Sequence, residues 1–305
     1  MYKVLKRYCL IILAIFFFIN SNAQNKYMPP NPYWDWDGIT HWTRYMITNP
    51  GYMGPNALPV PELRSGLVGA ETRIQTGYAY YHNKMDPTHN LFTKIIVPIY
   101  KNKLAVEFSV VPVERFNMDS ALRWERHTHL LKGEGFAFGD IYFGSNIQLV
   151  RDHRSLPDLV LRLICKTASG GHLAEARYTD SPGYYIDLNF GKTIGNPKPD
   201  GFQAKIIGMF GFMAWQTYLP NNRQNDAFIF GGGLMLSSKS IEFNNNISGY
   251  FGYMNLGDQP VIFRSDLTFK GLHTDFKLGF KYGINDFDYQ SINVSVIVHW
   301  ETGKN

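Results

Sequence analysis

Two short histidine motifs have spacings that suggest metal binding or catalysis. In His127-Thr-His129 the two imidazoles would share one face of a strand and could ligate a metal, but no third ligand stands nearby. In His153-Arg-Ser155 a histidine precedes a hydroxyl by two residues, as in nucleophilic hydrolysis of lipids, without an identifiable carboxylate to orient it. We therefore predict no catalytic residues, no metal site and no cofactor.

Residues 169–182 form a polar connection between two predicted strands. Its charged side chains could bind a solute at the mouth of a pore, or they could only hold the loop together through their own polar contacts. The candidates in this loop are His172, Glu175, Arg177 and Asp180.

Acidic and basic side chains also recur at alternate positions within apolar segments. A buried, unpaired charge is costly, so we expect these side chains to pair with one another or to contact water. They would either form a salt-bridge network that fills a barrel or line a path for solute. These lumen-lining candidates are Glu107, Asp140, Arg162, Lys166, Asp187, Arg264, Asp266, Asp275 and Lys277, and Lys281 follows the same pattern.

Long strands with period-2 alternation would carry these charges. In residues 272–282 the even positions are apolar apart from Thr274, and the odd positions are mostly charged. The apolar side chains would face lipid; Val110 and Leu188 are two examples, and Tyr282 and Trp300 would belong to aromatic girdles. Most predicted strands have 10–14 residues, enough for the roughly 9–11 that a tilted strand needs to cross a bilayer. The twelve predicted strands are 71–82, 91–100, 103–114, 136–149, 157–168, 183–193, 202–216, 227–237, 240–253, 260–269, 272–282 and 289–300.

Three predicted two-residue turns, at 101–102, 238–239 and 270–271, test whether the apolar face continues between strands. Each turn would join two apolar residues, and all three turns lie on one side of the meander. The longer connections, including 217–226, lie mainly on the other side, as in outer-membrane barrels with short periplasmic turns. The pairs would be Ile99 with Leu104, Leu236 with Ile241, and Phe269 with Leu272. The sequence thus predicts an all-β fold: a transmembrane, antiparallel, up-and-down β-barrel of about twelve strands.

The N-terminus has the pattern of a cleaved secretory signal peptide at residues 1–23. A basic start precedes the ten-residue apolar run from Leu10 to Ile19, and Ser21-Asn22-Ala23 offers a cleavage site. Removing this segment removes three basic and no acidic residues, so the net charge falls from +5 to +2. The charge therefore indicates no nucleic-acid partner. Only Cys165 remains in the mature chain, so no internal disulfide can form.

Residues 24–67 differ from the remainder, the predicted barrel of residues 68–305. They contain seven of the sixteen prolines and three of the six tryptophans, a composition that excludes a strand-rich region. Two interpretations stay open for this N-terminal segment: a periplasmic arm that packs on the barrel, or a plug that enters it.

Three stretches of the sequence carry a resemblance to known proteins: the Ala23-Gln24 processing end, residues 49–59, and residues 176–184. They resemble uncharacterised bacterial outer-membrane barrels of the group that includes meta-pathway phenol-degradation and transporter-like proteins. The resemblance implies a barrel that takes up small compounds, hydrophobic ones among them, and it carries no catalytic residues.

We therefore expect a channel or transporter of the bacterial outer membrane, in contact with outer-membrane lipid and with a small-molecule solute, and not an enzyme. Two alternatives are an outer-membrane lipid-modifying hydrolase and a structural barrel with a closed lumen. The sequence specifies neither the substrate nor the oligomeric state.

Overall fold

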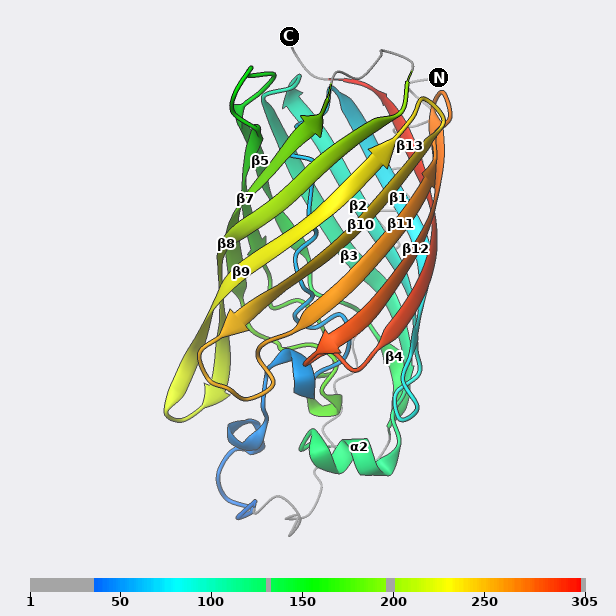
Figure 1. Ribbon diagram of the computed structural model, residues 1–305. Coiled ribbons are helices and arrows are strands. Elements are labelled where there is room, and N and C mark those ends of the chain that lie inside the picture. The colour runs from blue at the N-terminus through cyan, green and yellow to red at the C-terminus, as the bar shows by residue number, and fades with distance from the viewer. Residues whose placement is uncertain (1–35, 130–132, 196–200, 303–305) are drawn as a thin grey trace.

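The computed structural model describes residues 36–129, 133–195 and 201–302, which form a closed antiparallel β-barrel (Figure 1). Within these residues, twelve strands make up the wall, and β1 pairs with β13 to close the ring. The predicted fold class and strand number are confirmed. The signal peptide lies outside the described residues and stays a prediction. The wall strands are β1 (Glu71–His82), β2 (Thr88–Tyr100), β3 (Leu104–Asn117), β5 (Tyr142–Val150), β6 (Asp158–Lys166), β7 (Gly183–Ile194), β8 (Gln203–Leu219), β9 (Asn222–Ser237), β10 (Ile241–Gly252), β11 (Val261–Phe269), β12 (Thr274–Asn285) and β13 (Gln290–Glu301).

The prediction of one strand at 136–149 is wrong. The structure divides it into β5 and a short strand outside the ring, β4 (Glu134–Ala137), which pairs with the far end of β3. Between the two, the Asp140 carboxylate turns inward, 2.6 Å from Lys166 Nζ, and accepts a hydrogen bond from the Gly170 N–H at 2.7 Å. Because these contacts hold Asp140 inside the barrel, the backbone around it leaves the β-ladder.

The long connection predicted at 217–226 is also wrong, because β8 and β9 continue as a hairpin to a tight connection at 220–221. The hairpin extends below the ends of β10, β11 and β12 in Figure 1. Beyond the membrane both faces of a hairpin contact water, so its residues need not alternate between apolar and polar. One tight turn therefore lies on the side that was expected to carry only longer loops.

Two of the three predicted turn pairs are wrong in register, although the apolar faces do continue across the turns. Leu236 pairs with Phe243, two positions from its expected partner, and Phe269 pairs with Phe276, four positions from its expected partner. At the third turn Leu104 pairs with Tyr100 next to an irregularity in β2, but the strands beyond it have the predicted register, with Val97 opposite Val106. An even shift leaves every side chain on its original face, so alternation could not distinguish these registers.

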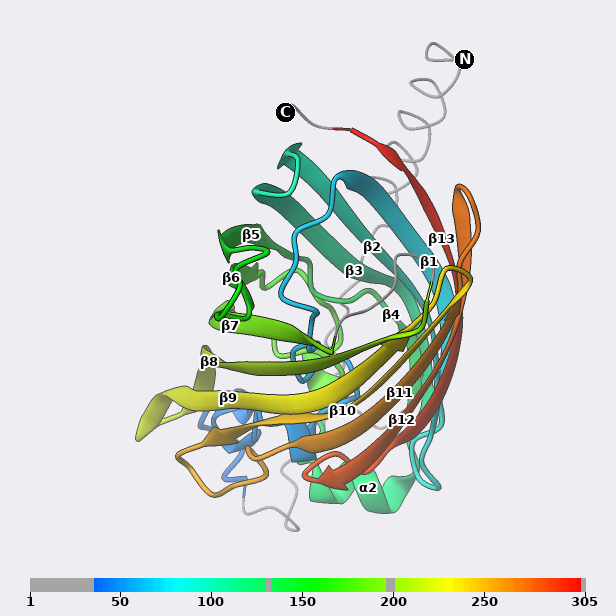
Figure 2. The same cartoon turned by 45° about the horizontal axis from the view of Figure 1, so that its top comes forward.

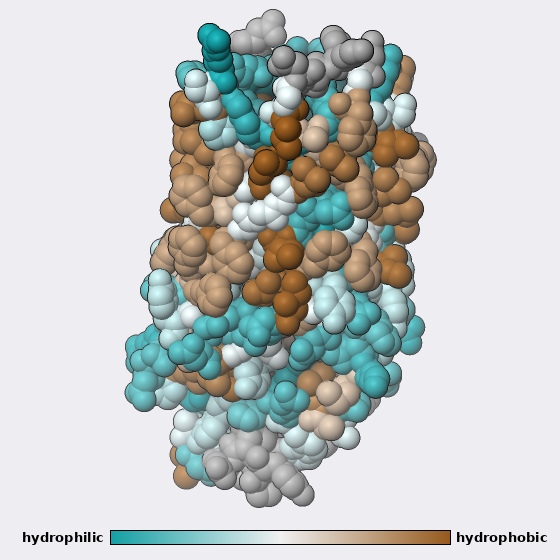
Figure 3. Space-filling view, viewed as in Figure 1, coloured by the Kyte–Doolittle hydropathy of each residue, from teal (hydrophilic) through white to brown (hydrophobic). Residues whose placement is uncertain are grey.

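An apolar belt surrounds the barrel. Figure 3 shows hydrophobic side chains over the upper and middle part of the visible face and hydrophilic ones below them. Ile186, Tyr282 and Trp300 are among many large apolar side chains that are more than a third exposed. A surface of this kind is stable against lipid and not against water. Val110 departs from the prediction: it is buried and lines an interior cavity, because an irregularity in β3 shifts which residues face inward.

Before β1 begins, the chain passes through the barrel from one end to the other (Figures 1 and 2). We call the end with the 101–103 and 238–240 turns the turn end, and the opposite end the loop end. Two short 3-10 turns, η2 (Trp42–Tyr45) and η3 (Pro50–Tyr52), lie toward the loop end, and the chain then crosses to the turn end. We call residues 48–68, inside the barrel, the lumen segment.

The loop end also carries α2 (Ser120–Glu125) and η4 (Leu173–Glu175). Asp119 begins α2, where its carboxylate accepts a hydrogen bond from the Leu122 N–H at 3.0 Å. No helix among the described residues has the length and hydrophobicity to cross a bilayer.

Candidate functional site

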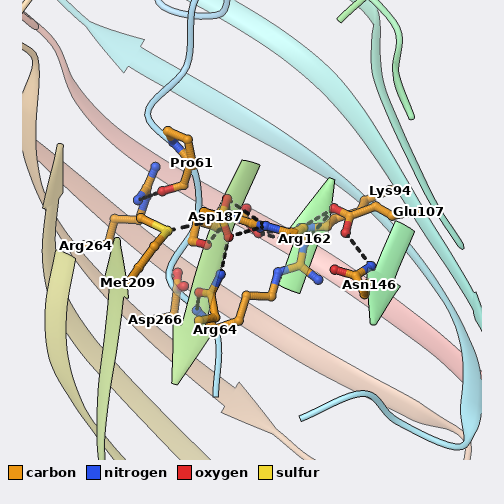
Figure 4. A network of polar contacts seen from close by, with 12 residues as sticks. Pro61, Arg64, Lys94, Glu107, Asn146, Arg162, Asp187, Met209, Arg264 and Asp266 are labelled. Atoms are coloured by element: carbon orange, nitrogen blue, oxygen red, sulfur yellow. Dashed lines mark hydrogen bonds and ion pairs between the residues drawn. The ribbon is translucent and has the colours of Figure 1, made fainter. Parts of the chain in front are cut away.

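The middle of the lumen holds a buried ion pair that also binds the lumen segment (Figure 4). Arg162 on β6 and Asp187 on β7 are each 1 % exposed, and Arg162 contacts the carboxylate through both Nε (3.0 Å) and Nη2 (2.8 Å). Arg162 Nη2 also donates to the Glu62 carbonyl at 3.0 Å. On β7, Asn189 accepts a hydrogen bond from the Arg64 N–H at 2.8 Å. The wall formed by β6 and β7 therefore holds the lumen segment directly.

A second group of charges joins the lumen segment to β2 and β3. Arg64 Nη2 lies 2.6 Å from Glu107 Oε1, and Lys94 lies 3.5 Å from the same oxygen. Lys94 also pairs with Glu62. Asn146 donates to the second carboxylate oxygen of Glu107 at 3.0 Å. Each carboxylate in this group thus has at least one cation, which buried carboxylates require.

Arg264 on β11 holds the lumen segment in a different way, because it binds backbone oxygens. Its Nη1 donates to the Pro61 carbonyl at 3.0 Å and to Ser248 Oγ at 2.7 Å, and its Nη2 bonds to the Val60 carbonyl. The segment at this point is proline-rich and extended, so its carbonyls have no ladder partner of their own. The guanidinium supplies the missing donors.

The other predicted inward charges also lie inside the barrel and mostly in pairs. Lys166 pairs with Asp140 at 2.6 Å, and Lys277 pairs with Asp266 at 2.8 Å. Asp275 pairs with Arg73 at 2.8 Å. The structure therefore places eight of the nine lumen-lining candidates on the wall strands facing inward, and Asp140 in the connection before β5 with its carboxylate inside the barrel.

A fully buried ionic cluster lies toward the loop end. Arg177 contacts Asp86 at 2.6 Å and Glu114 at 2.7 Å, and Arg126 contacts Asp86 at 3.0 Å. The Tyr178 hydroxyl donates to Glu114 at 2.9 Å. We call Asp86, Glu114, Arg126, Arg177 and Tyr178 the loop-end cluster.

The lumen segment packs closely on this cluster. A Cβ on Gly54 would lie 2.8 Å from the Arg177 guanidinium carbon, so a larger residue there would displace the guanidinium from its present position. Asn56 donates to Glu114 at 2.6 Å. Burial raises the pKa of Asp86, but the Arg177 and Arg126 guanidinium groups outweigh burial and leave its pKa below the usual value.

The four loop candidates are not brought together. His172 and Glu175 pair at 2.9 Å, and the hydrogen bond that the imidazole donates to the Glu175 carboxylate is the main reason that the pKa of His172 is raised. Arg177 turns into the barrel instead, and Asp180 is exposed. Arg177 therefore pairs with buried carboxylates inside the barrel, and it does not line the pore mouth where the sequence suggested a solute contact.

The two histidine motifs do not form a reactive site in this geometry. His127 and His129 follow α2 and lie on no strand, and His129 stacks on Trp42 with 4.7 Å between ring centroids. The described residues hold no group of three or more potential metal ligands. His153 Nδ1 accepts the backbone N–H groups of Ser155 (3.2 Å) and Leu156 (3.0 Å), so that nitrogen is not available as a base toward the Ser155 hydroxyl.

Two adjoining spaces lie beside the lumen segment. A cavity of about 190 Å³ is lined by the segment and by residues of β1, β2, β3, β5, β6, β7, β11, β12 and β13, and a vestibule of about 580 Å³ lies nearer the turn end. The two spaces share a small set of polar lining residues, which therefore marks the boundary between them. The shared residues are Glu62, Arg64, Gln75, Lys94 and Lys277.

Sequence reasoning missed much of this site for two reasons. Glu62 and Arg64 belong to a segment without periodicity, so no pattern gives the direction of their side chains. Glu114 lies beyond the irregularity in β3, where alternation counted from Glu107 gives the wrong face. Lys94 stands alone in an apolar strand, which was a usable signal for an inward charge.

No protein-family model matches the chain, and no curated protein matches its sequence. Among solved structures, the fold resembles an outer-membrane channel from Pseudomonas putida F1, with a TM-score of 0.53 and 10 % identity over 80 % of this chain and 97 % of that one. A structure of the KdgM porin gives a TM-score of 0.46 and 8 % identity over 73 % of this chain and 98 % of that one. At this level of identity the first comparison establishes the fold: a barrel of the outer-membrane type. The phenol-degradation grouping is not confirmed.

Proposed function

We propose that this protein is a channel or transporter for small molecules in the bacterial outer membrane, and that the lumen segment acts as a plug that narrows its path. The apolar belt suits the barrel to lipid, whereas its interior is lined by charged and amide side chains. A polar interior inside an apolar exterior is the arrangement that a solute path requires.

The observation that carries the proposal is the pair of adjoining spaces beside the lumen segment. At β6 and β7, Arg162 and Asn189 bond directly to the segment, and Arg162 also lines the cavity. A solute that enters the vestibule at the turn end therefore reaches the cavity past Glu62, Arg64 and Lys94, whose side chains line both spaces. These side chains form the constriction of the proposed path.

Planar-bilayer conductance tests this proposal. The signal peptide is retained and residues 36–66 are deleted, which removes most of the plug. We expect wild type to conduct weakly and the deletion variant to conduct several-fold more. Deleting residues 219–222, at the tip of the β8–β9 hairpin, serves as a control that shortens the chain outside the wall. Migration that changes on boiling, in a denaturing gel, identifies folded barrels.

A second variant covers the case in which the deletion does not fold. Glu62→Gln with Arg64→Gln removes two charges from the constriction and retains the segment. We expect a smaller increase in conductance. Folded protein that conducts in neither variant would contradict the channel proposal.

That result would favour the second candidate function, a structural barrel with a closed lumen. The observation in its favour is the loop-end cluster, in which Asp86, Glu114 and Arg177 are fully buried and Gly54 packs against them. A tightly packed ionic layer of this kind resists solute unless the segment moves.

A further inference from the structure

We infer that the 190 Å³ cavity binds a small organic carboxylate through Arg264 and Lys281. This inference rests on the proposed function for the route by which the ligand arrives and for its identification as a solute of the channel. The binding site itself is argued from two cations that differ from the other inward cations of the wall.

Arg264 and Lys281 are both positively charged and lie opposite each other on neighbouring strands. They face each other directly in the register of β11 and β12, and both line the cavity. Like charges directly opposite each other destabilise a sheet. Among the described residues, neither has a carboxylate within ion-pairing distance, whereas Lys277, on β12 as well, pairs with Asp266 at 2.8 Å.

The hydrogen bonds of these two cations leave donors unused. Arg264 is 5 % exposed, and its Nε has no hydrogen-bond partner among the described residues. In Arg162 the corresponding Nε donates to Asp187 at 3.0 Å. Within the part of the chain that the structure describes, Lys281 has only the Tyr81 hydroxyl at 3.4 Å and the face of the same ring. A carboxylate is the group that would satisfy both cations.

The acidic residues around the cavity do not fulfil this role, because each already has a cation. Glu62 and Glu107 pair with Lys94, and Asp140 pairs with Lys166. Arg264 and Lys281 are therefore the surplus positive charge of the cavity.

The remaining lining selects for a ligand with an apolar body. Ala79, Phe92 and Val110 contribute apolar surface, and Asn90 and Asn293 contribute amide groups. A cavity of about 150 Å³ can hold benzene, so about 190 Å³ has room for a body of that size together with a carboxylate. The ligand class is therefore a compact monocarboxylate no larger than a single six-membered ring.

Isothermal titration calorimetry on the full mature chain in detergent tests the inference, with benzoate as the probe. Benzamide has the same shape without the charge, and acetate and inorganic phosphate are anions without the apolar body. We expect saturable binding of benzoate at least tenfold tighter than binding of the other three. Equal binding of benzamide, or of acetate and phosphate, would overturn the ligand class.

Lys281→Gln should weaken benzoate binding about tenfold, because it removes one charge-assisted contact. Lys281→Arg should restore most of the affinity. Lys103→Gln makes the same charge change at an exposed turn residue and should leave affinity unaltered. An equal loss of affinity in Lys103→Gln and Lys281→Gln, or no loss in the latter, would contradict the site.

This measurement requires no flow through the barrel, so its outcome separates the two proposals. Conductance without benzoate binding would refute the carboxylate site alone. Benzoate binding without conductance would refute the channel and leave the site.

Discussion

The loop-end cluster and the Arg264–Lys281 pair both place cationic side chains inside the barrel, but only the cluster provides carboxylates to pair with them. In the cluster, Arg177 and Arg126 lie against Asp86 and Glu114, so cations and carboxylates are matched. In the pair, two cations face each other with no carboxylate within ion-pairing distance among the described residues. The comparison indicates that a matched buried group stabilises the fold, whereas an unmatched one is available for a ligand.

Arg177→Met removes one cation from the loop-end cluster, and we expect it to lower the free energy of unfolding more than any other proposed substitution. The substitution keeps the aliphatic stem but leaves two buried carboxylates with a single cation. Removing one partner of a buried ion pair typically costs about 3–5 kcal/mol. We expect the free energy of unfolding, from urea titration in detergent, to fall by about that amount.

Arg115→Met is the matched control, because Arg115 is exposed on the same strand as Glu114. Its effect should stay within about 0.5 kcal/mol. Equal effects of the two substitutions would mean that the cluster does not stabilise the barrel.

Acid should weaken the cluster through Asp86. The pKa of Asp86 in the folded protein lies below its unfolded value of about 3.9, so its stabilisation is present above that value. It is lost as pH falls through the lower folded pKa. We expect the free energy of unfolding of wild type to decrease over this acid range more steeply than that of Asp86→Asn, when both are measured by urea titration at a series of pH values. Parallel profiles would exclude this role for Asp86.

Lys281→Gln removes one cation of the Arg264–Lys281 pair, and we expect it to have the smallest effect on stability. The substitution removes a like-charge contact with Arg264, so the folded protein should be as stable as wild type or more stable by up to about 1 kcal/mol. Lys277→Gln, which breaks the pair with Asp266, should instead destabilise the barrel. Thermal unfolding of both variants measures the difference. A clear destabilisation by Lys281→Gln would show that its charge is matched after all.

Alternation in the sequence was sufficient to predict the barrel, because in most strands apolar residues that face lipid alternate with polar residues that face the interior. It could not fix the register, since the shift that pairs Leu236 with Phe243 leaves the faces unchanged. It failed at Val110, where an irregularity reverses the faces, and in the polar β8–β9 hairpin, where no contrast exists.

The interior contacts were harder to predict than the wall. Inward positions such as Arg162 and Asp187 follow from parity, and their pairing follows from the cost of burying charge. The contacts made by the lumen segment cannot be predicted in this way. Arg264 binds the backbone carbonyl groups of Val60 and Pro61, and every residue type has a backbone carbonyl. Only the three-dimensional path of the segment identifies these contacts.

Solute should pass the lumen segment on the side of β1, and thiol blocking of single-channel current can detect this path. In a Cys165→Ser background, Gln75→Cys places a thiol where both spaces meet, and Asn189→Cys places one on the opposite wall. A charged, membrane-impermeant methanethiosulfonate should reduce the current of Gln75→Cys and leave that of Asn189→Cys unchanged. Block at Asn189→Cys together with no block at Gln75→Cys would contradict a solute path on the side of β1.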